Sequence, residues 1–197
     1  MPNAAAIIRD RLAIEVIAVN QPIALTDESL QRVGVLYLTG QTDFQLDSEA
    51  VDALRNYVER GGILLASPIC GEEAFAEPMR QLLGDISGGK PLDPMPRDHP
   101  AFGTRFGGYE VSKVGIRRPS QKRSKPSPTK REPLKVSQRF DAPIIESIAT
   151  EGVDNIFYSP LDLSCALESP NSIQCPGYST EDAAKIIAGL ILYGLNQ

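Results

Sequence analysis

Polar and small residues gather in three loops of the sequence, each of which directly follows a short apolar segment. In chain order these residues are Thr39, Gly40, Gln41, Asp43, Ser67, Cys70, Gly71, Glu72, Ser159, Asp162, Ser164 and Cys165. Open parallel sheets bind their ligands outside the carboxyl ends of the strands. If the apolar segments are parallel strands, the three loops meet at one edge, here called the rim, and we predict a ligand-binding site there. The alternative is that these residues are only polar caps and turns.

Cys70 is the strongest single candidate for a catalytic residue. It lies between an expected strand and an expected helix, where a helix N-terminus favours the nucleophilic thiolate. Two observations oppose this role. Pro68 and Glu72 occupy positions where a nucleophile elbow needs small residues. The only histidine, His99, lies in a proline-rich segment, although a cysteine nucleophile usually needs a histidine base. The alternative is a small buried residue at a tight turn.

The spacing of metal-binding residue types predicts no metal site, and we expect no cofactor. The three cysteines and one histidine occur without a C-x-x-C or H-x-x-x-H spacing, and no glycine-rich phosphate loop follows any expected strand. Cys70, Cys165 and Cys175 are few and unevenly spaced, which argues against a disulfide framework and suits a reducing compartment. Cys70 and Cys165 could still meet at the rim as a redox pair. We expect a cytoplasmic location for the chain as given.

The elements that would position these residues alternate between helices and strands. Apolar runs predict buried strands, and apolar residues at helical spacing between cap residues and glycines predict helices. Helices are expected over 4–12, about 47–60, about 72–83 and from 180 onward, with a short helical turn near 26–29. Strands are expected over 14–19, 33–38, 63–66, 109–116, 144–148 and 155–158, the last two as a hairpin or as neighbours. The alternation predicts an α/β fold with a mostly parallel sheet.

Length and composition fit one globular domain, because the chain has 197 residues, of which 42% are hydrophobic and 23% are charged. No apolar run approaches the roughly 20 residues that a membrane span needs. Residues 84–108 are rich in glycine and proline and are expected to be irregular. Since the expected helix at 4–12 has no strand before it, we expect the chain to be a fragment of a longer protein.

One stretch of the chain is strongly basic, while the remainder is acidic. Residues 113–139 hold ten basic residues and one acidic residue, so this stretch carries +9 and leaves −14 for the rest of a chain with net charge −5. Its centre, about 117–135, is polar and is predicted to be an insertion that forms a mobile loop or hairpin tip. Candidates for binding an anionic partner, such as nucleic acid or anionic lipid, are Lys122, Arg123, Lys125, Lys130 and Arg131. The alternative is a solvated loop that offsets the acidic body.

Several phrases of the sequence, taken in order, resemble one protein family. They are LYLTG at 36–40, RGG at 60–62, ILLAS followed by CG at 63–71, DHPAF at 98–102 and YSPLDLSCALE at 158–168. The chain from Ile14 to Leu195 resembles the bacterial domain-of-unknown-function family 4159, which is grouped with the class I glutamine amidotransferase-like superfamily. The resemblance implies a flavodoxin-like three-layer α/β sandwich. It implies no settled activity, and Gln41 and Leu167 depart from the His and Trp that many relatives carry.

These observations lead to one preferred function and two alternatives. The resemblance implies that active members of the superfamily pair a cysteine nucleophile with a His-x-Glu arrangement, which this chain lacks. We therefore expect a catalytically incomplete domain that binds a small ligand or a protein partner. The first alternative is a cysteine-dependent hydrolase or amidotransferase-like enzyme that uses Cys70. The second is an adaptor that docks on anionic partners through residues 113–139.

Overall fold

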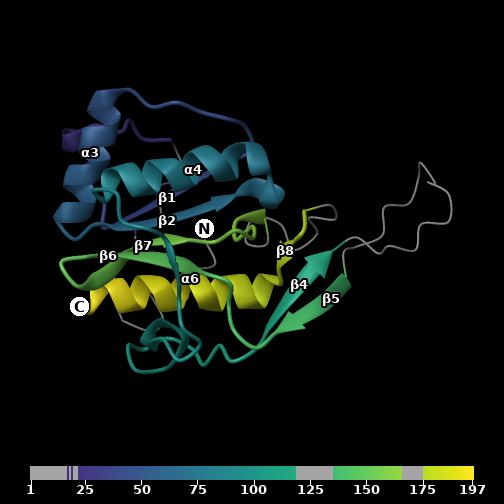
Figure 1. Ribbon diagram of the computed structural model, residues 1–197. Helices are drawn as coiled ribbons and strands as arrows, with labels where there is room; N and C mark the ends of the chain where they lie inside the picture. The colour runs from purple at the N-terminus through teal and green to yellow at the C-terminus, as the bar shows by residue number, and fades with distance from the viewer. Residues whose placement is uncertain (1–16, 18, 20–21, 119–134, 166–174) are drawn as a thin grey trace, which may run out of the picture.

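The computed structural model describes residues 17, 19, 22–118, 135–165 and 175–197, and of residues 135–138 it describes only the backbone. Figure 1 shows a sheet with helices on both sides and a second, smaller sheet that extends from one end. The helix expected at 4–12 and most of the strand expected at 14–19 lie outside the described residues.

The main sheet has five strands, and three neighbouring strands in it run parallel. Their order across the sheet is β1 (Val35–Gly40), β2 (Ile63–Pro68), β7 (Val153–Tyr158), β6 (Glu146–Thr150) and β3 (Asp93–Pro94). β1, β2 and β7 are parallel, whereas β6 is antiparallel to both β7 and β3. The mixed α/β fold with a mostly parallel sheet is confirmed, as is the hairpin formed by the last two expected strands.

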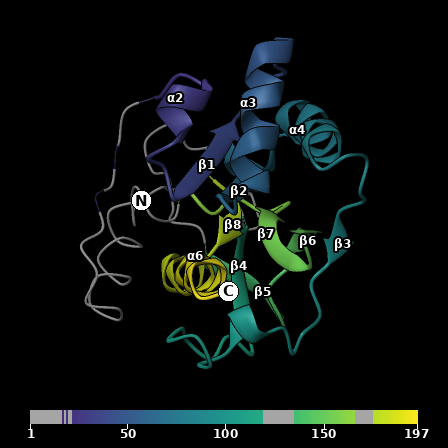
Figure 2. The same ribbon diagram turned by 90° about the vertical axis from the view of Figure 1, so that its left-hand side faces the viewer.

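Helices cover both faces of this sheet. Figure 2 shows α3 (Ser48–Glu59) and α4 (Glu73–Ile86) on one side and α6 (Thr180–Leu195) on the other, with the short α2 (Asp27–Leu30) beside α3. All six residues of β2 are buried, because this strand has covered faces and paired neighbours on both sides. A strand in this position has to be apolar in both directions, which explains its continuous run of small and aliphatic residues.

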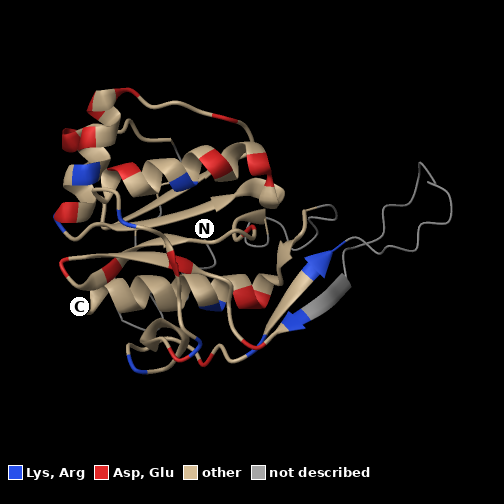
Figure 3. Cartoon of the chain, in the orientation of Figure 1, with Lys and Arg blue, Asp and Glu red and all other residues tan. Residues whose placement is uncertain are grey.

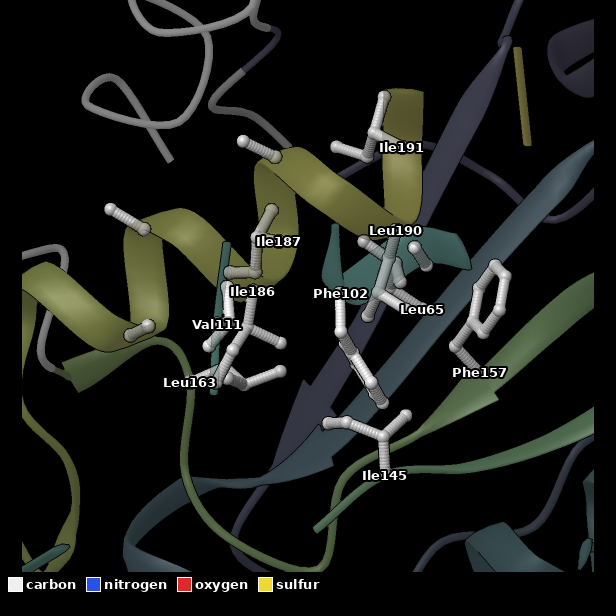
Figure 4. Packing of buried hydrophobic residues seen from close by; sticks show 14 of the residues in the cluster. Leu65, Phe102, Val111, Ile145, Phe157, Leu163, Ile186, Ile187, Leu190 and Ile191 are labelled. Carbon is white, nitrogen blue, oxygen red and sulfur yellow. The ribbon is translucent and has the colours of Figure 1, made fainter. Parts of the chain in front are cut away.

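Side chains on the two faces of the sheet form separate apolar clusters. Successive residues of a strand point to opposite faces, so Leu64 packs toward α3 and α4 while Leu65 packs toward α6. Figure 4 shows the second cluster, in which Leu65 and Phe157 of the sheet lie against Leu190 of α6. The sheet thus lies between two apolar cores, and loops cover the ends of its strands.

The helix ends follow the cap residues in the sequence. The side chain of Asp47 accepts a hydrogen bond from the first turn of α3, and that of Ser179 does the same for α6. After α3 the chain turns at Gly61 with φ +84°. A Cβ at the next residue, Gly62, would lie 2.4 Å from the ring of Tyr57, so this position also requires glycine.

A second sheet of three strands stands beside the carboxyl ends of β2 and β7 (Figure 1). Its order is β5 (Lys135–Phe140), β4 (Val114–Arg118) and β8 (Gly177–Tyr178), with both pairings antiparallel. β4 begins later than the strand expected over 109–116, and β5 and β8 were not expected at all. β4 and β5 pair antiparallel on either side of the centre of the basic stretch, and residues 119–134 between them lie outside the described part of the chain.

Asn155 links β7 to the end of α3 and thereby sets the position of β7 in the sheet. Its side chain is buried, and Nδ2 donates to the carbonyl oxygens of Val58 at 2.8 Å and Gly62 at 3.1 Å. Its Oδ1 accepts from the Thr150 hydroxyl at 2.6 Å. The amide therefore connects three segments by hydrogen bonds in the interior.

We expect Asn155→Ala to lower the free energy of unfolding by about 1–3 kcal/mol, because buried polar groups lose their partners. Urea unfolding followed by circular dichroism measures this change. The matched control is Asn56→Ala, which removes an exposed amide that lies 3.2 Å from Asp27, and it should change stability by less than about 0.5 kcal/mol. Equal losses in the two variants would contradict the role of Asn155.

Candidate functional site

The carboxyl ends of β1, β2 and β7 meet at one edge of the main sheet. Thr39 pairs with Ser67, and Ala66 pairs with Tyr158. Beyond the last pair, the amide of Ser159 donates to the carbonyl of Ala66 at 2.9 Å. Because these strands are parallel and end together, the loops that follow them leave from the same edge. The three loops singled out in the sequence therefore do lie together at the rim.

A tight turn directs Cys70 toward the loop after β7. The turn is the 3-10 segment Ile69–Gly71, which directly follows β2. Cys70 has φ 56° and ψ 15°, a left-handed conformation that is unfavourable for a residue with a side chain, and Gly71 continues it with φ +74°. In this conformation the amide of Cys70 donates to the carboxylate of Asp162. The turn after β2 is thereby tied to the loop after β7.

Asp162 places a buried carboxylate at the centre of the rim. Asp162 is only 1% exposed. Oδ1 accepts hydrogen bonds from the amide of Ser164 at 2.7 Å, from the Ser164 hydroxyl at 3.0 Å and from the amide of Cys165 at 3.0 Å. Oδ2 accepts from the amide of Cys70. Donors of this kind replace the water that a carboxylate loses on burial, and they fix its orientation.

Three cysteine sulfurs lie beside this carboxylate. Cys70 and Cys175 form a disulfide, with their Cα atoms 4.7 Å apart. The Sγ of Cys165 lies 4.0 Å from that of Cys70, and the Sγ of Cys175 lies 2.9 Å from Oδ2 of Asp162. One ligand atom from each of these four residues, which we call the Cys–Asp cluster, lies within 4.8 Å of the other three. The four could hold a metal ion, a possibility that residue spacing did not reveal.

The disulfide between Cys70 and Cys175 was not predicted, because cysteine number and spacing argued against a disulfide framework. Cys70 and Cys175 are 105 residues apart in sequence, so their contact depends on the fold and not on a local motif. Cys70 and Cys165, considered from the sequence as a redox pair, do approach each other, with 4.0 Å between the two sulfurs, but the covalent partner of Cys70 is Cys175.

A close approach of the backbone at β8 brings Cys175 to the cluster. Gly177 forms a parallel bridge with Asp162. A Cβ at Gly177 would lie 2.6 Å from the carbonyl oxygen of Asp162, so only glycine allows this approach. Cys175 itself is 2% exposed. The sequence did not identify Cys175 as a site residue, because no strand was expected before the last helix. Gly177, two residues further on, was the one sign of a close backbone contact.

Hydroxyl groups of β1 and β2 lie next to the cluster. The Tyr37 and Ser67 hydroxyls are 2.6 Å apart, and the Thr39 hydroxyl donates to the carbonyl of Ser67 at 2.8 Å. Burial raises the pKa of Tyr37 to about 12, and the negative charge of Asp162 adds to that rise. Tyr37 is therefore a neutral hydroxyl that can donate or accept a hydrogen bond at the rim.

Arg117 of β4 places a buried positive charge beside the cluster. It is 8% exposed, and its Nε donates to the carbonyl of Tyr178 at 2.9 Å. Burial lowers the pKa of the guanidinium from its usual value, while Cys165 and Asp162 favour its charged form. Since a guanidinium stays protonated in proteins, the rim combines a fixed cation with a buried carboxylate.

The remaining residues predicted for the rim lie outside the cluster. Gln41, Asp43 and Glu72 are exposed, and Glu72 caps α4 without a side-chain hydrogen bond. Gly40 leaves room for an aromatic ring of α4, since a Cβ there would lie 2.6 Å from that ring. The Ser159 hydroxyl bonds to the backbone of its own loop. As contacts to a ligand, these positions stay predictions.

His99 lies at the opposite end of the main sheet from Cys70. Its Nε2 is 3.1 Å from Oδ2 of Asp154, and its Nδ1 accepts from the amide of Ala101 at 3.2 Å. Asp154 is the second residue of β7, whereas Tyr158 at the rim is the last. At about 3.3 Å per residue, the two ends are roughly 13 Å apart. His99 is therefore not placed to act as a base for Cys70.

Charge is distributed unevenly over the described residues. Figure 3 shows acidic positions along α3 and α4 and basic positions on β4 and β5. The five candidates for anion binding, at 122–131, lie outside the described residues. Within the part of the chain that the structure describes, no helix is long and apolar enough to cross a membrane.

Comparison with known proteins gives a family. The family model described as Domain of unknown function (DUF4159) matches residues 1–195, a range that includes all three rim loops and all members of the Cys–Asp cluster. No curated protein matches the chain. The family resemblance found in the sequence is confirmed.

The pair formed by His99 and Asp154 predicts a pH-dependent contribution to stability. The hydrogen bond with His99 lowers the pKa of the Asp154 carboxyl, more than burial raises it. Because the folded-state pKa lies below the unfolded-state value of about 4, this contribution is fully present above that value and is lost as the pH falls through the folded-state pKa.

We expect the urea midpoint of the unmodified protein to fall more steeply below about pH 4 than that of Asp154→Asn. The control is Asp141→Asn, which changes an exposed carboxylate and should keep the slope of the unmodified protein. If Asp154→Asn keeps that slope as well, the prediction is wrong.

Proposed function

The chain belongs to the DUF4159 family of domains of unknown function, and from this premise we propose that it is a catalytically incomplete binding module. In this proposal the chain is a single flavodoxin-like domain related to the class I glutamine amidotransferase-like superfamily. Its rim binds a small ligand or a protein partner. The helices on both faces of the sheet support the proposal, because open α/β sheets of this kind bind ligands at the carboxyl ends of their strands.

One observation carries the choice of binding over catalysis. The Cys70 sulfur is not a thiol, and His99 does not lie beside it. That sulfur is bonded to Cys175, and His99 is paired with Asp154 at the other end of the sheet. A cysteine nucleophile acts as a thiolate beside a general base. Both oxygens of the nearby Asp162 carboxylate accept hydrogen bonds from backbone amides.

The groups at the rim suit the recognition of a ligand. They comprise a buried carboxylate, a buried guanidinium, the paired hydroxyls of Tyr37 and Ser67, and the partly exposed side chain of Cys165. A small number of convergent polar groups above an apolar core is the usual composition of a binding site. Tyr37, Ser67 and Arg117 lie on strands, whereas Asp162 and Cys165 lie in the loop after β7.

A cysteine-dependent hydrolase or amidotransferase-like enzyme is the second candidate, and one observation favours it. Cys70 adopts a left-handed conformation on the turn between β2 and α4. Nucleophile elbows also present their reactive residue on a strained turn from strand to helix. On this alternative, reduction of the disulfide would free the Cys70 thiol for attack.

Docking on an anionic partner through residues 113–139 is a third candidate. Its support is the contrast in charge between this basic stretch, at +9, and the rest of the chain, at −14. The exposed Arg118 and Arg139 on β4 and β5 extend the basic stretch into the described residues. This function would act beside the rim and does not exclude a ligand there.

We expect the reduced protein to show no Cys70-dependent turnover, because no base is placed to activate the thiol. The assays are release of ammonia from glutamine and hydrolysis of an activated ester, each with the unmodified protein, Cys70→Ser and Cys165→Ser. All three proteins should give the same background rate. Turnover that is lost in Cys70→Ser and kept in Cys165→Ser would replace the binding proposal by the enzyme alternative.

For the docking candidate, we expect weaker retention on heparin when Lys122, Arg123, Lys125, Lys130 and Arg131 are all changed to Gln. Binding to a polyanion releases counterions in proportion to the number of cations in contact, so the salt concentration needed for elution should fall. Arg60→Gln, which changes an exposed residue at the end of α3, is the control. Unchanged retention in the fivefold variant would rule out docking through this stretch.

A further inference from the structure

We propose that the Cys–Asp cluster is a Zn²⁺ site in the reduced protein, with Cys70, Asp162, Cys165 and Cys175 as the four ligands. Zn²⁺ would then be the ligand that the rim binds, so the proposal rests on the proposed function of the rim as a binding site. The bound species follows from the four donor residues of the cluster. We also assign the disulfide to the oxidised, metal-free state of the same site.

The donor set is the first reason for zinc. Three sulfurs and one carboxylate oxygen lie within 4.8 Å of one another, and structural zinc sites are four-coordinate with Cys, His and Asp ligands. With metal–sulfur bonds of about 2.3 Å, two tetrahedral ligands are about 3.8 Å apart. The sulfurs of Cys70 and Cys165 are 4.0 Å apart. Magnesium and calcium need several oxygen ligands, so a site with three sulfurs excludes them.

The contact between Cys175 and Asp162 is the second reason. The Cys175 sulfur lies 2.9 Å from Oδ2 of Asp162, and both residues are buried. In the disulfide this sulfur carries no proton, so the contact joins two atoms that bear lone pairs with nothing to bridge them. In the reduced protein a thiol proton can bridge the two atoms, and a dication can bind both of them.

The orientation of the carboxylate is the third reason. Oδ1 of Asp162 is held by the amide and hydroxyl of Ser164 and by the amide of Cys165. These donors turn Oδ2 toward the sulfurs of the cluster. Metal ligands are commonly oriented by such outer hydrogen bonds, which also tune the affinity of the site.

Charge balance favours the same cation. Three thiolates and one carboxylate carry four negative charges, of which Zn²⁺ neutralises two. The buried guanidinium of Arg117 interacts electrostatically with Cys165 and Asp162 and offsets a third. The amide of Cys70 adds a dipole directed at the carboxylate. Without a metal, three thiolates this close together would repel one another, so the metal-free site holds thiols or the disulfide.

Reduction and metal binding are two balanced steps. A dithiol reductant gives two electrons and two protons to the Cys70–Cys175 disulfide and becomes an intramolecular disulfide itself, which leaves three thiols in the cluster. Zn²⁺ then displaces three thiol protons, which pass to solvent, as metal binding to cysteines requires. Cys70 and Cys165 are partly exposed, so the ion has a path to the site.

The test uses the full chain, reduced with a dithiol and desalted without oxygen before Zn²⁺ alone is added. We expect one tightly bound zinc per chain in the reduced protein and none in the oxidised protein. Asp162→Asn and Cys165→Ser should each weaken binding at least about tenfold. Asp141→Asn, which changes an exposed carboxylate away from the rim, should bind as the unmodified protein does. Reduced protein that binds no zinc overturns the proposal.

A second measurement guards against variants that fail to fold. In the unmodified reduced protein, zinc should protect all three cysteines from alkylation, as read by mass spectrometry, and Co²⁺ in its place should give the absorption of thiolate-bound cobalt. Zinc that binds while the cysteines alkylate at the metal-free rate would also overturn the site. These outcomes are independent of the activity assays: absence of zinc with no turnover removes only the metal, whereas Cys70-dependent turnover removes the binding function.

Discussion

A single buried carboxylate, that of Asp162, determines the arrangement of the loops at the rim. Its Oδ1 fixes its own loop through Ser164 and Cys165, and its Oδ2 reaches the amide of Cys70 on the neighbouring strand end. A buried carboxylate is unfavourable unless donors replace the lost water, so both loops must stay where their amides meet it. The oxygen that holds Cys70 in place also faces Cys175. The backbone of the rim and the chemistry of its sulfurs therefore depend on one group.

Much of this framework could be predicted from the sequence. Continuous apolar runs identified β1 and β2, and polar residues at Asp47 and Thr180 marked helix starts. Parallel strands then placed three loops at one edge. β8 escaped prediction because two residues carry no periodicity, and β5 lies in a polar, basic stretch. Cys175 was missed for the same reason as β8. Its place in the cluster follows from the lack of a side chain at Gly177, and spacing rules describe only ligands that are close in sequence.

The two ends of β7 have different roles, although they belong to one strand. At its start, Asp154 pairs with His99, whose ring packs on Tyr193 with 4.8 Å between ring centroids, in a contact that fastens α6 and its neighbours to the sheet. Past its end, Asp162 contacts Cys70, Cys165 and Cys175. Contacts this far apart with no shared partner act independently. This separation places the cysteines of the Cys–Asp cluster and His99 at different ends of β7.

The link between Cys70 and Cys175 also changes the topology of the oxidised chain. With this bond in place, the backbone from residue 70 to residue 175 is part of a closed covalent ring of about a hundred residues, and β4, β5 and the basic stretch lie on that ring. A cut by a protease anywhere in the insertion opens the ring but leaves both fragments attached to each other. The same cut in the reduced chain leaves no covalent bond between them. The oxidation state of the rim thus decides whether a cut between residues 119 and 134 leaves one covalently connected molecule or two chains.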